Sequence, residues 1–349
     1  MKKRSNKLVI FLIVLITILT AYIIIGVLPR PQNYAGNNPM RKTGDTPLFI
    51  AHGGGHMEFP DNTLEACYNA YSVDKNVMLE IDVSITKDGV VILSHDITLD
   101  RKTNVTGAIA DWNYSDLMAQ KVDFGYTNKT YEDGEEVKIV EGSARIKFKS
   151  DYEALKGKEV TPLDVTYPEG VKPRDNTVFL ATKLEELMVA FPNNRINVEI
   201  KQSEENGKKA FAETLRLLEK YNAWDRMVLA SFHDEIYNEF MTYQKSEGAN
   251  PAFMYSPGTG GATKFFIMQM LEVDLFFWDG ISVLQLPTEQ LGFNLATKSL
   301  IDAAHSHNIA VHYWTIDDVE TMKKLVEIGA DGIMTNYPHR LKDVYDGKI

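Results

Sequence analysis

From Leu48 to the end of the chain, short β-rich apolar runs alternate with segments whose apolar residues recur at helical spacing. Alternation with short links is typical of a parallel sheet, because each helix carries the chain back to the edge where the next strand begins. About eight such units follow Leu48, and this number favours a closed barrel over an open doubly wound sheet. The predicted fold class is therefore α/β, a (β/α)8 TIM barrel over residues 47–349.

One stretch after the second strand, residues 125–177, interrupts this alternation. It is charged and irregular, with short β-like pieces such as VKIV and RIKF. It is too long for an ordinary connecting loop, so we predict an insertion into the barrel. The insertion either covers a site or is a solvated excursion without a role.

The N-terminus carries a long apolar run. No charged residue occurs from Leu8 to Leu28, and Lys2, Lys3, Arg4 and Lys7 precede this run. About 20 apolar residues span a bilayer, whereas the apolar part of a signal peptide has roughly 7–15. We predict a single-pass anchor within residues 1–30, a polar linker over 31–46 and, from the positive-inside rule, a cytoplasmic N-terminus. The barrel then lies outside the cytoplasm, at the cell membrane. A long, cleaved signal peptide is the alternative.

The charge and cysteine content of the chain exclude some kinds of partner and cross-link. Without residues 1–30 the chain has 32 basic and 48 acidic side chains, a net charge of −16. Such a surface repels nucleic acid, so no nucleic-acid partner is expected. Cys67 is the only cysteine, which rules out an internal disulfide. The aromatic-rich stretch 265–278 is most simply a helix packed on the barrel, and a lipid-contacting patch is the alternative.

Ionisable residues interrupt three otherwise apolar strands near the ends that form the active-site mouth of such a barrel. They are His52 after the first strand, Glu80 and Asp82 in the second, His95 after the short strand that follows, and Glu199 and Lys201 in the third. A buried charge is unfavourable unless it is paired or bound to a metal. The pattern therefore indicates a functional site. Three further histidines, at positions 305, 307 and 312, show no obvious convergence with these carboxylates, and we predict structural roles for them.

Glu80 and Asp82 are two residues apart in a strand, so both point to the same face. Neighbouring carboxylates repel each other, and either a shared proton or a divalent cation relieves the repulsion. With Glu199 as a third ligand, an all-oxygen set suits Mg²⁺ or Ca²⁺. His52 and His95 would then flank the cation as a general acid–base pair, and Lys201 would neutralise phosphate charge.

Three glycines, Gly53, Gly54 and Gly55, directly follow His52. Glycine at this point indicates close approach of the backbone to a neighbour. Free N–H groups of Gly53 and Gly54 would form an anion site for phosphate. A tight turn from strand to loop explains the same residues without a ligand.

Several longer strings carry a family resemblance: IAHGGG, PDNTLEA and LEIDVSITKDGVVILSHDITLDRKTNVTG near the start, and YWTIDDVETMKKLVEIGADGIMTNYP near the end. They resemble the glycerophosphodiester phosphodiesterase family from about Leu48 to Arg340, apart from the insertion. The resemblance implies a TIM barrel that uses a divalent metal, Ca²⁺ or Mg²⁺, to cleave glycerophosphodiesters to glycerol 3-phosphate and an alcohol. A glycerol hydroxyl would attack phosphorus, and water would open the resulting cyclic phosphate.

Carried over by position, the resemblance makes His52 and His95 the acid–base pair. It makes the three carboxylates, Glu80, Asp82 and Glu199, the metal ligands. Lys201 would contact phosphate, and Trp314, at the end of the seventh strand, would form an apolar wall for the glycerol.

Two positions depart from the family pattern. Gly53 stands where the family usually has arginine after the first histidine, and Asp61 replaces glutamate in the familiar P-E-N-T. Loss of the arginine removes a bidentate phosphate contact. The predicted function is a membrane-anchored, metal-dependent phosphodiesterase acting on a glycerophosphodiester, a lysolipid-like substrate or a related glycerol-phosphate diester of the cell envelope. The alternatives are a phospholipase D-like lyase that releases a cyclic phosphate, and a catalytically silent binding barrel.

Overall fold

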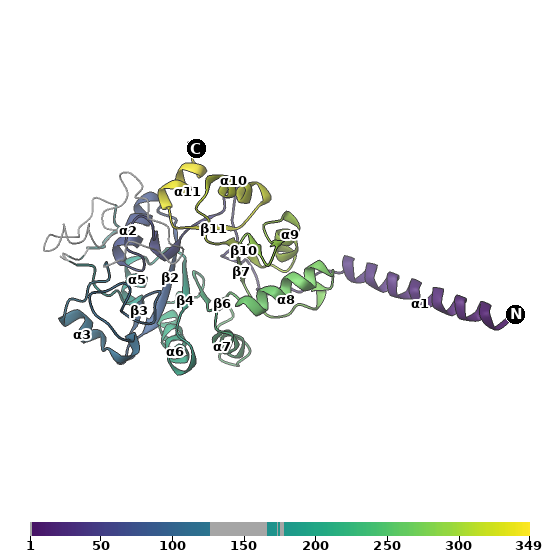
Figure 1. The fold of residues 1–349 in the computed structure, drawn as a ribbon, viewed down its shortest axis with the longest axis horizontal. Helices are drawn as coiled ribbons and strands as arrows, with labels where there is room; N and C mark the ends of the chain where they lie inside the picture. Colours follow the sequence, from purple (N-terminus) through teal and green to yellow (C-terminus); the bar gives the residue numbers. More distant parts are fainter. Residues whose placement is uncertain (1, 126–165, 173, 175–177) are drawn as a thin grey trace.

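The computed structural model describes residues 2–125, 166–172, 174 and 178–349 (Figure 1). Eight parallel strands are joined in the order β6-β5-β4-β2-β1-β11-β10-β7. They are β1 (Leu48–Ala51), β2 (Met78–Ile85), β4 (Ile196–Ile200), β5 (Met227–Ala230), β6 (Met254–Tyr255), β7 (Val283–Leu286), β10 (Ala310–Tyr313) and β11 (Gly332–Thr335). Between the two end strands, the Ser282 N–H donates to the carbonyl of Tyr255 at 3.0 Å. The sheet is thus a nearly closed barrel, and the predicted fold class is confirmed.

The helices lie around the outside of the barrel (Figure 1). They are α2 (Leu64–Val73), α5 (Leu184–Ala190), α6 (Glu204–Lys220), α7 (Asp234–Gln244), α8 (Thr259–Met270), α9 (Lys298–Ser306), α10 (Val319–Ile328) and α11 (Pro338–Tyr345). Their apolar faces bury leucine, isoleucine and phenylalanine against the outer side of the strands. This burial explains why the strands read as nearly continuous apolar runs, since helices cover one face and the barrel interior the other.

An excursion between β2 and α5 contains β3 (Val91–Leu93), the short 3₁₀ turn η2 (Ile109–Asp111) and α3 (Tyr114–Ala119). β3 pairs antiparallel with the end of β2. Most of the insertion predicted at 125–177 lies outside the described residues.

The N-cap of α2 is Thr63, whose side-chain oxygen accepts from the Ala66 N–H at 3.2 Å. Asn62 takes a left-handed backbone with φ of 57°, a conformation that asparagine tolerates. The Asn62 side chain does not cap α2 and instead makes hydrogen bonds with Asp82 at the active-site mouth.

Part of segment 31–46 packs beneath the barrel. Tyr34 and Met40 join the apolar cluster that fills its lower interior, and Met40 is fully buried. The Asn38 side chain donates to the carbonyls of Ser282 and Asn308 at 2.7 and 2.8 Å. This segment therefore forms the barrel floor, at the end opposite the active-site mouth.

The N-terminal helix α1 (Lys2–Val27) projects away from the barrel beside α8 (Figure 1). Its portion Lys7–Val27 has a mean hydropathy of 3.2 and contains no buried residue, so it is long and apolar enough to cross a membrane. A signal sequence near an N-terminus has the same properties. The helix is therefore compatible with both a membrane anchor and a cleaved signal peptide.

Candidate active site

A cavity of about 190 Å³ opens at the carboxyl ends of the barrel strands. Seven of the residues singled out in the sequence border it: His52, Glu80, Asp82, His95, Glu199, Lys201 and Trp314. They come from strands far apart in the chain, which the barrel brings to one mouth. The location agrees with the end of a TIM barrel that carries active sites.

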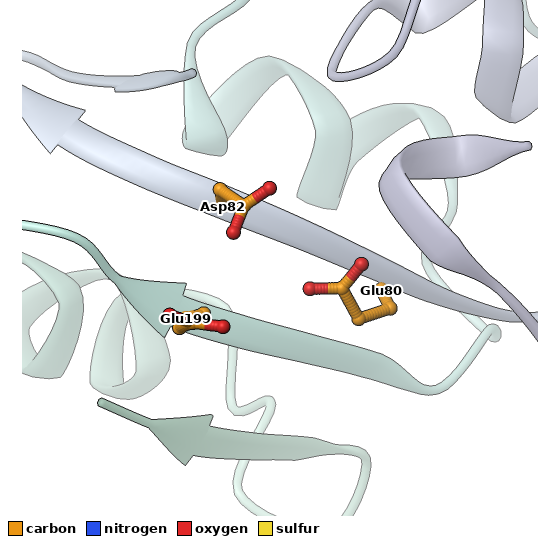
Figure 2. A group of neighbouring side chains, drawn as sticks. All are labelled: Glu80, Asp82 and Glu199. Carbon is orange, nitrogen blue, oxygen red and sulfur yellow. The ribbon is translucent and has the colours of Figure 1, made fainter. Parts of the chain in front are cut away.

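Three carboxylates converge inside this cavity. Asp82 on β2 lies directly opposite Glu199 on β4, and Glu80 lies two residues earlier on β2. Figure 2 shows the two side chains of β2 and that of Glu199 facing a common space. Their nearest oxygens all lie within 4.8 Å of one another. The donor set is all oxygen, which is what hard cations such as Mg²⁺ and Ca²⁺ prefer, so these residues fit a divalent cation.

The pKa shifts of Glu80 and Glu199 also support a cation site. Burial and the neighbouring Asp82 charge raise the pKa of Glu80 to about 8. Burial and Asp82 also raise the pKa of Glu199. A raised pKa means that the ionised cluster is unfavourable by itself. A cation held between the oxygens would remove that repulsion.

Neighbouring groups fix two of the carboxylates in place. The Gly53 N–H donates to Glu80 Oε2 at 2.8 Å. The Asn62 side chain makes two hydrogen bonds with Asp82. Its Nδ2 donates to Asp82 Oδ2 at 2.9 Å, and its Oδ1 accepts from the Asp82 backbone N–H at 2.8 Å. The carboxylates are therefore positioned before any ligand arrives.

His52 lies directly after β1 at the cavity wall. Its Nε2 is 3.9 Å from Glu80 Oε2, and its Nδ1 is 2.6 Å from Asn336 Oδ1. Asn336 in turn donates from its side-chain amide to Asp317 at 2.8 Å. Burial lowers the pKa of His52, but the Glu80 charge and the Asn336 hydrogen bond outweigh burial, so the pKa is raised. The chain from Asp317 through Asn336 orients this imidazole.

His95 also lines the cavity and lies in the loop that follows β3. Its Nδ1 is 2.9 Å from Asp96 Oδ1, and Arg101 binds the same carboxylate through two bonds of 2.7 and 2.8 Å. The hydrogen bond with Asp96 raises the pKa of His95. A histidine whose second nitrogen is held by a carboxylate is suited to proton transfer.

Lys201 connects the carboxylates to His95. Its Nζ is 2.9 Å from Glu199 Oε1, 3.5 Å from Asp82 Oδ1 and 3.5 Å from His95 Nε2. Burial lowers the pKa of Lys201, but Asp82 and Glu199 outweigh burial and raise the pKa. The ammonium group therefore stays charged beside the cavity, where it can attract a phosphate.

Gly53 and Gly54 are placed differently from the other predicted residues. Neither borders the cavity; both have positive φ, +56° and +79°. A Cβ at Gly53 would lie 2.9 Å from that of Asp61, and one at Gly54 would lie 3.0 Å from that of Ala66. Since the Gly53 N–H already donates to Glu80, this geometry favours close packing of the turn over a phosphate contact.

Sequence reasoning missed the residues that hold the catalytic candidates. Asn336 and Asp317 orient His52, Asn62 clamps Asp82, and Asp96 with Arg101 orients His95. The position of Asn336 immediately after the last strand was an available signal, because strand ends form the mouth. For Asp317 the sequence offers no comparable signal, since its role depends on the folded loop.

The model of the glycerophosphoryl diester phosphodiesterase family matches residues 52–340 of this chain. The probable glycerophosphodiester phosphodiesterase 2 of Mycobacterium tuberculosis is 23% identical over 85% of the chain and 92% of its own length. The lysophospholipase D GDPD1 of Homo sapiens is 25% identical over 84% of each chain.

Solved structures share the fold. A putative glycerophosphoryl diester phosphodiesterase of Silicibacter pomeroyi matches with a TM-score of 0.61 and 19% identity, over 90% of this chain and 99% of its own. A phosphodiesterase of Oleispira antarctica, solved in complex with the product sn-glycerol-3-phosphate, matches with a TM-score of 0.58 and 17% identity, over 86% and 97%. With the family model covering most of its length, this chain belongs to the glycerophosphoryl diester phosphodiesterase family.

Proposed function

We propose that this glycerophosphodiester phosphodiesterase is metal-dependent and membrane-anchored, and that it hydrolyses glycerophosphodiesters to glycerol 3-phosphate and an alcohol outside the cytoplasm. The supporting observation is the convergence of three carboxylates at the barrel mouth, in a cavity that two oriented histidines also line. Lysolipid-like diesters belong to the same substrate class, because they share the glycerol phosphate unit.

Glu80, Asp82 and Glu199 are the proposed ligands of a divalent cation, Ca²⁺ or Mg²⁺. When bound, the cation supplies positive charge that polarises the phosphodiester and favours the transition state. Lys201 lies close enough to the same carboxylates to add a second positive charge for the phosphate.

His52 and His95 are the proposed acid–base pair. One imidazole removes the proton from the hydroxyl that attacks phosphorus, and the other gives a proton to the departing alcohol. Asn336 and Asp96 hold the Nδ1 atoms of the two rings, so Nε2 is the proposed proton-exchanging nitrogen of each ring. Trp314 is the proposed apolar wall for the glycerol carbons, since it borders the cavity.

α1 is the proposed anchor, with the basic N-terminus in the cytoplasm and the barrel outside. Its charge-free apolar length supports this reading. Mass spectrometry of the mature protein tests it. An intact N-terminus in the membrane fraction is expected, and a protein that begins after residue 28 would contradict the anchor.

The activity itself is tested with purified full chain and glycerophosphocholine. We expect choline release that stops after thorough chelation with EDTA and returns with Ca²⁺ or Mg²⁺. Undiminished activity after chelation would remove the proposed metal role. Phosphorus NMR of the products separates hydrolysis from a lyase reaction, because a cyclic phosphate that persists would contradict hydrolysis.

A further inference from the structure

A second cavity, of about 720 Å³, adjoins the catalytic cavity and is mainly apolar. The two cavities share four lining residues, Phe232, Pro257, Gln285 and Trp314. Beyond Trp314 the second cavity runs along α8 and β7 beneath the small hairpin of β8 (Glu289–Gln290) and β9 (Phe293–Asn294). We call it the apolar groove. Its volume lies in the range of cavities that bind small molecules.

Phe232 and Trp314 form the boundary between the two cavities. Their rings meet edge to face with centroids 5.5 Å apart. Lys201 Nζ lies 5.9 Å from the Phe232 centroid on the catalytic side. The Phe232–Trp314 pair therefore separates the charged catalytic cavity from the apolar groove. A ligand that spans this boundary needs a phosphate at one end and a hydrocarbon part at the other.

The far end of the apolar groove is open and hydrophobic. Ile267 and Met270 on α8 and Phe293 on the hairpin are about half exposed, and Leu291 at the hairpin turn is 89% exposed. Leu271, Phe276 and Trp278, in the segment that follows α8, are also exposed. Exposed apolar side chains that gather in one part of a surface mark an interaction site, and we call these seven residues the apolar rim.

Contacts with the N-terminal segment place the apolar rim beside the end of α1. The Tyr22 hydroxyl donates to the Leu271 carbonyl at 3.2 Å, and Arg30 pairs with Asp274 at 2.9 Å. Tyr22 lies five residues before the end of α1, about 7.5 Å along a helix that rises about 1.5 Å per residue. If α1 spans the bilayer, the end of α8 reaches the headgroup region, where interfacial apolar residues are buried by roughly 5–10 Å.

We propose that the apolar groove holds the hydrocarbon chain of a single-chain glycerophospholipid, which enters from the bilayer through the apolar rim. This inference rests on the proposed function, because the phosphodiester of the same lipid must reach the carboxylates and histidines. The glycerol lies at Trp314, which borders both cavities, and the chain on its outer hydroxyl continues along α8. The continuity of the groove with the catalytic cavity, its apolar lining and its position beside the anchor identify a membrane lipid as the occupant.

The reaction for such a substrate is the same hydrolysis with a different product. The bond between phosphorus and the headgroup oxygen breaks, water supplies an oxygen to phosphorus, and the headgroup alcohol takes a proton. Lysophosphatidylcholine therefore gives choline and an acylated glycerol 3-phosphate. Glycerophosphocholine also gives choline, so one assay compares two substrates that differ only in the chain.

The test uses the full chain with Ca²⁺ or Mg²⁺ in vesicles of phosphatidylglycerol and phosphatidylethanolamine, which contain no choline. We expect a higher kcat/KM for lysophosphatidylcholine than for glycerophosphocholine. Ala262→Trp fills the groove away from the catalytic cavity. It should lower kcat/KM for lysophosphatidylcholine by about tenfold or more, as when two or more methylenes lose their apolar contacts, and leave glycerophosphocholine unchanged.

A second variant and a control keep the test valid even if Ala262→Trp does not fold. Ile267→Asp places a charge at the apolar rim and should also lower only lysophosphatidylcholine turnover. Val189→Asp makes the same kind of change at an exposed apolar position of α5 and should change neither rate.

Equal kcat/KM for the two substrates in the wild type would overturn the inference and leave the proposed function intact. The same holds if both variants lose the two activities in parallel, or if neither variant changes them, as expected when a protein partner occupies the groove. A wild type that cleaves neither substrate with metal present would instead contradict the proposed function itself.

Discussion

The two ends of the barrel use the same residue types for different purposes. At the floor, His305 Nε2 lies 2.7 Å from Asp331 and His307 Nε2 lies 3.0 Å from Asp274, so each imidazole has one carboxylate. His312 Nε2 meets the Met40 carbonyl at 2.8 Å. At the mouth, three carboxylates face one another around a cavity. Pairing of opposite charges at the floor stabilises the fold, whereas like charges crowd together at the mouth, where a divalent cation is proposed to bind.

The directions of the pKa changes express this difference. Burial raises the pKa of Asp331, but the hydrogen bond and charge of His305 outweigh burial and lower it. At the mouth, burial and Asp82 raise the pKa of Glu80 to about 8. Ionised Asp331 therefore stabilises the fold, and ionised Glu80 destabilises it in the absence of a cation. Variants at the two ends should consequently have opposite effects.

The largest expected contrast is in catalytic rate. His52→Ala and His95→Ala should each lower kcat by about 10²-fold or more, the usual scale for an acid–base group. His305→Ala at the floor should leave kcat unchanged for the folded fraction. Choline release from glycerophosphocholine measures all three, and near-normal rates for both mouth variants would show that the chemistry lies elsewhere.

Stability should respond in the opposite sense. Asp331→Asn removes the charge that pairs with His305 and weakens a buried network, and should lower the unfolding free energy by about 1–3 kcal/mol with kcat unchanged. Glu80→Gln removes like-charge repulsion and should raise the Tm of EDTA-treated protein while abolishing activity. Thermal unfolding followed by circular dichroism checks both, and a Glu80→Gln variant less stable than the wild type in EDTA would contradict this contrast.

The dependence of stability on pH sharpens the same contrast. The folded pKa of Asp331 is depressed, so its contribution is present at neutral pH and is lost as pH falls toward that value. The folded pKa of Glu80 is raised, so its destabilising effect is complete above about pH 8 and fades as pH falls from there. The Tm difference between each charge-removing variant and the wild type should therefore shrink at acid pH for both sites, from opposite signs. A difference of the same sign at the two ends would break the comparison.

A smaller effect is expected at the residue that holds His95. Asp96→Asn removes the carboxylate whose hydrogen bond raises the pKa of His95. The limb of the pH–rate profile that reports His95 should move to lower pH by about 1 pH unit, the scale of such perturbations in folded proteins. Asp100→Asn changes an exposed acid of the same loop and is the matched control. An unmoved profile in Asp96→Asn would exclude this positioning role.

The sequence predicted the barrel and the mouth residues because both depend on local pattern. Apolar strands alternate with helices, and charges within the strands at Glu80, Asp82 and Glu199 are conspicuous in an apolar run. The sequence did not predict the supporting bonds of Asn336 and Asp317, which join residues that only the folded loops bring together. The role of segment 31–46 as a floor was equally hidden, since a polar composition resembles that of a linker.

The apolar groove shows the same limit. The aromatic-rich stretch 265–278 was compatible with a packed helix or a lipid-contacting patch. In the structure Phe265 is buried in the core, while Ile267 and Met270 are exposed at the groove. The helix thus has one face buried in the core and one apolar face exposed at the groove, and the sequence alone does not separate the two faces.

The most direct test of the central claim is calorimetric titration of EDTA-treated, dialysed full chain with Ca²⁺ and with Mg²⁺. We predict one strongly bound cation per chain in the wild type. Glu80→Gln and Glu199→Gln should each weaken binding by more than the about 10- to 100-fold that follows loss of an outer partner of a metal site, while Asp331→Asn binds as the wild type does. Absence of binding in the wild type, or an affinity in both glutamine variants equal to that of the wild type, would contradict the claim that these carboxylates jointly hold a divalent cation.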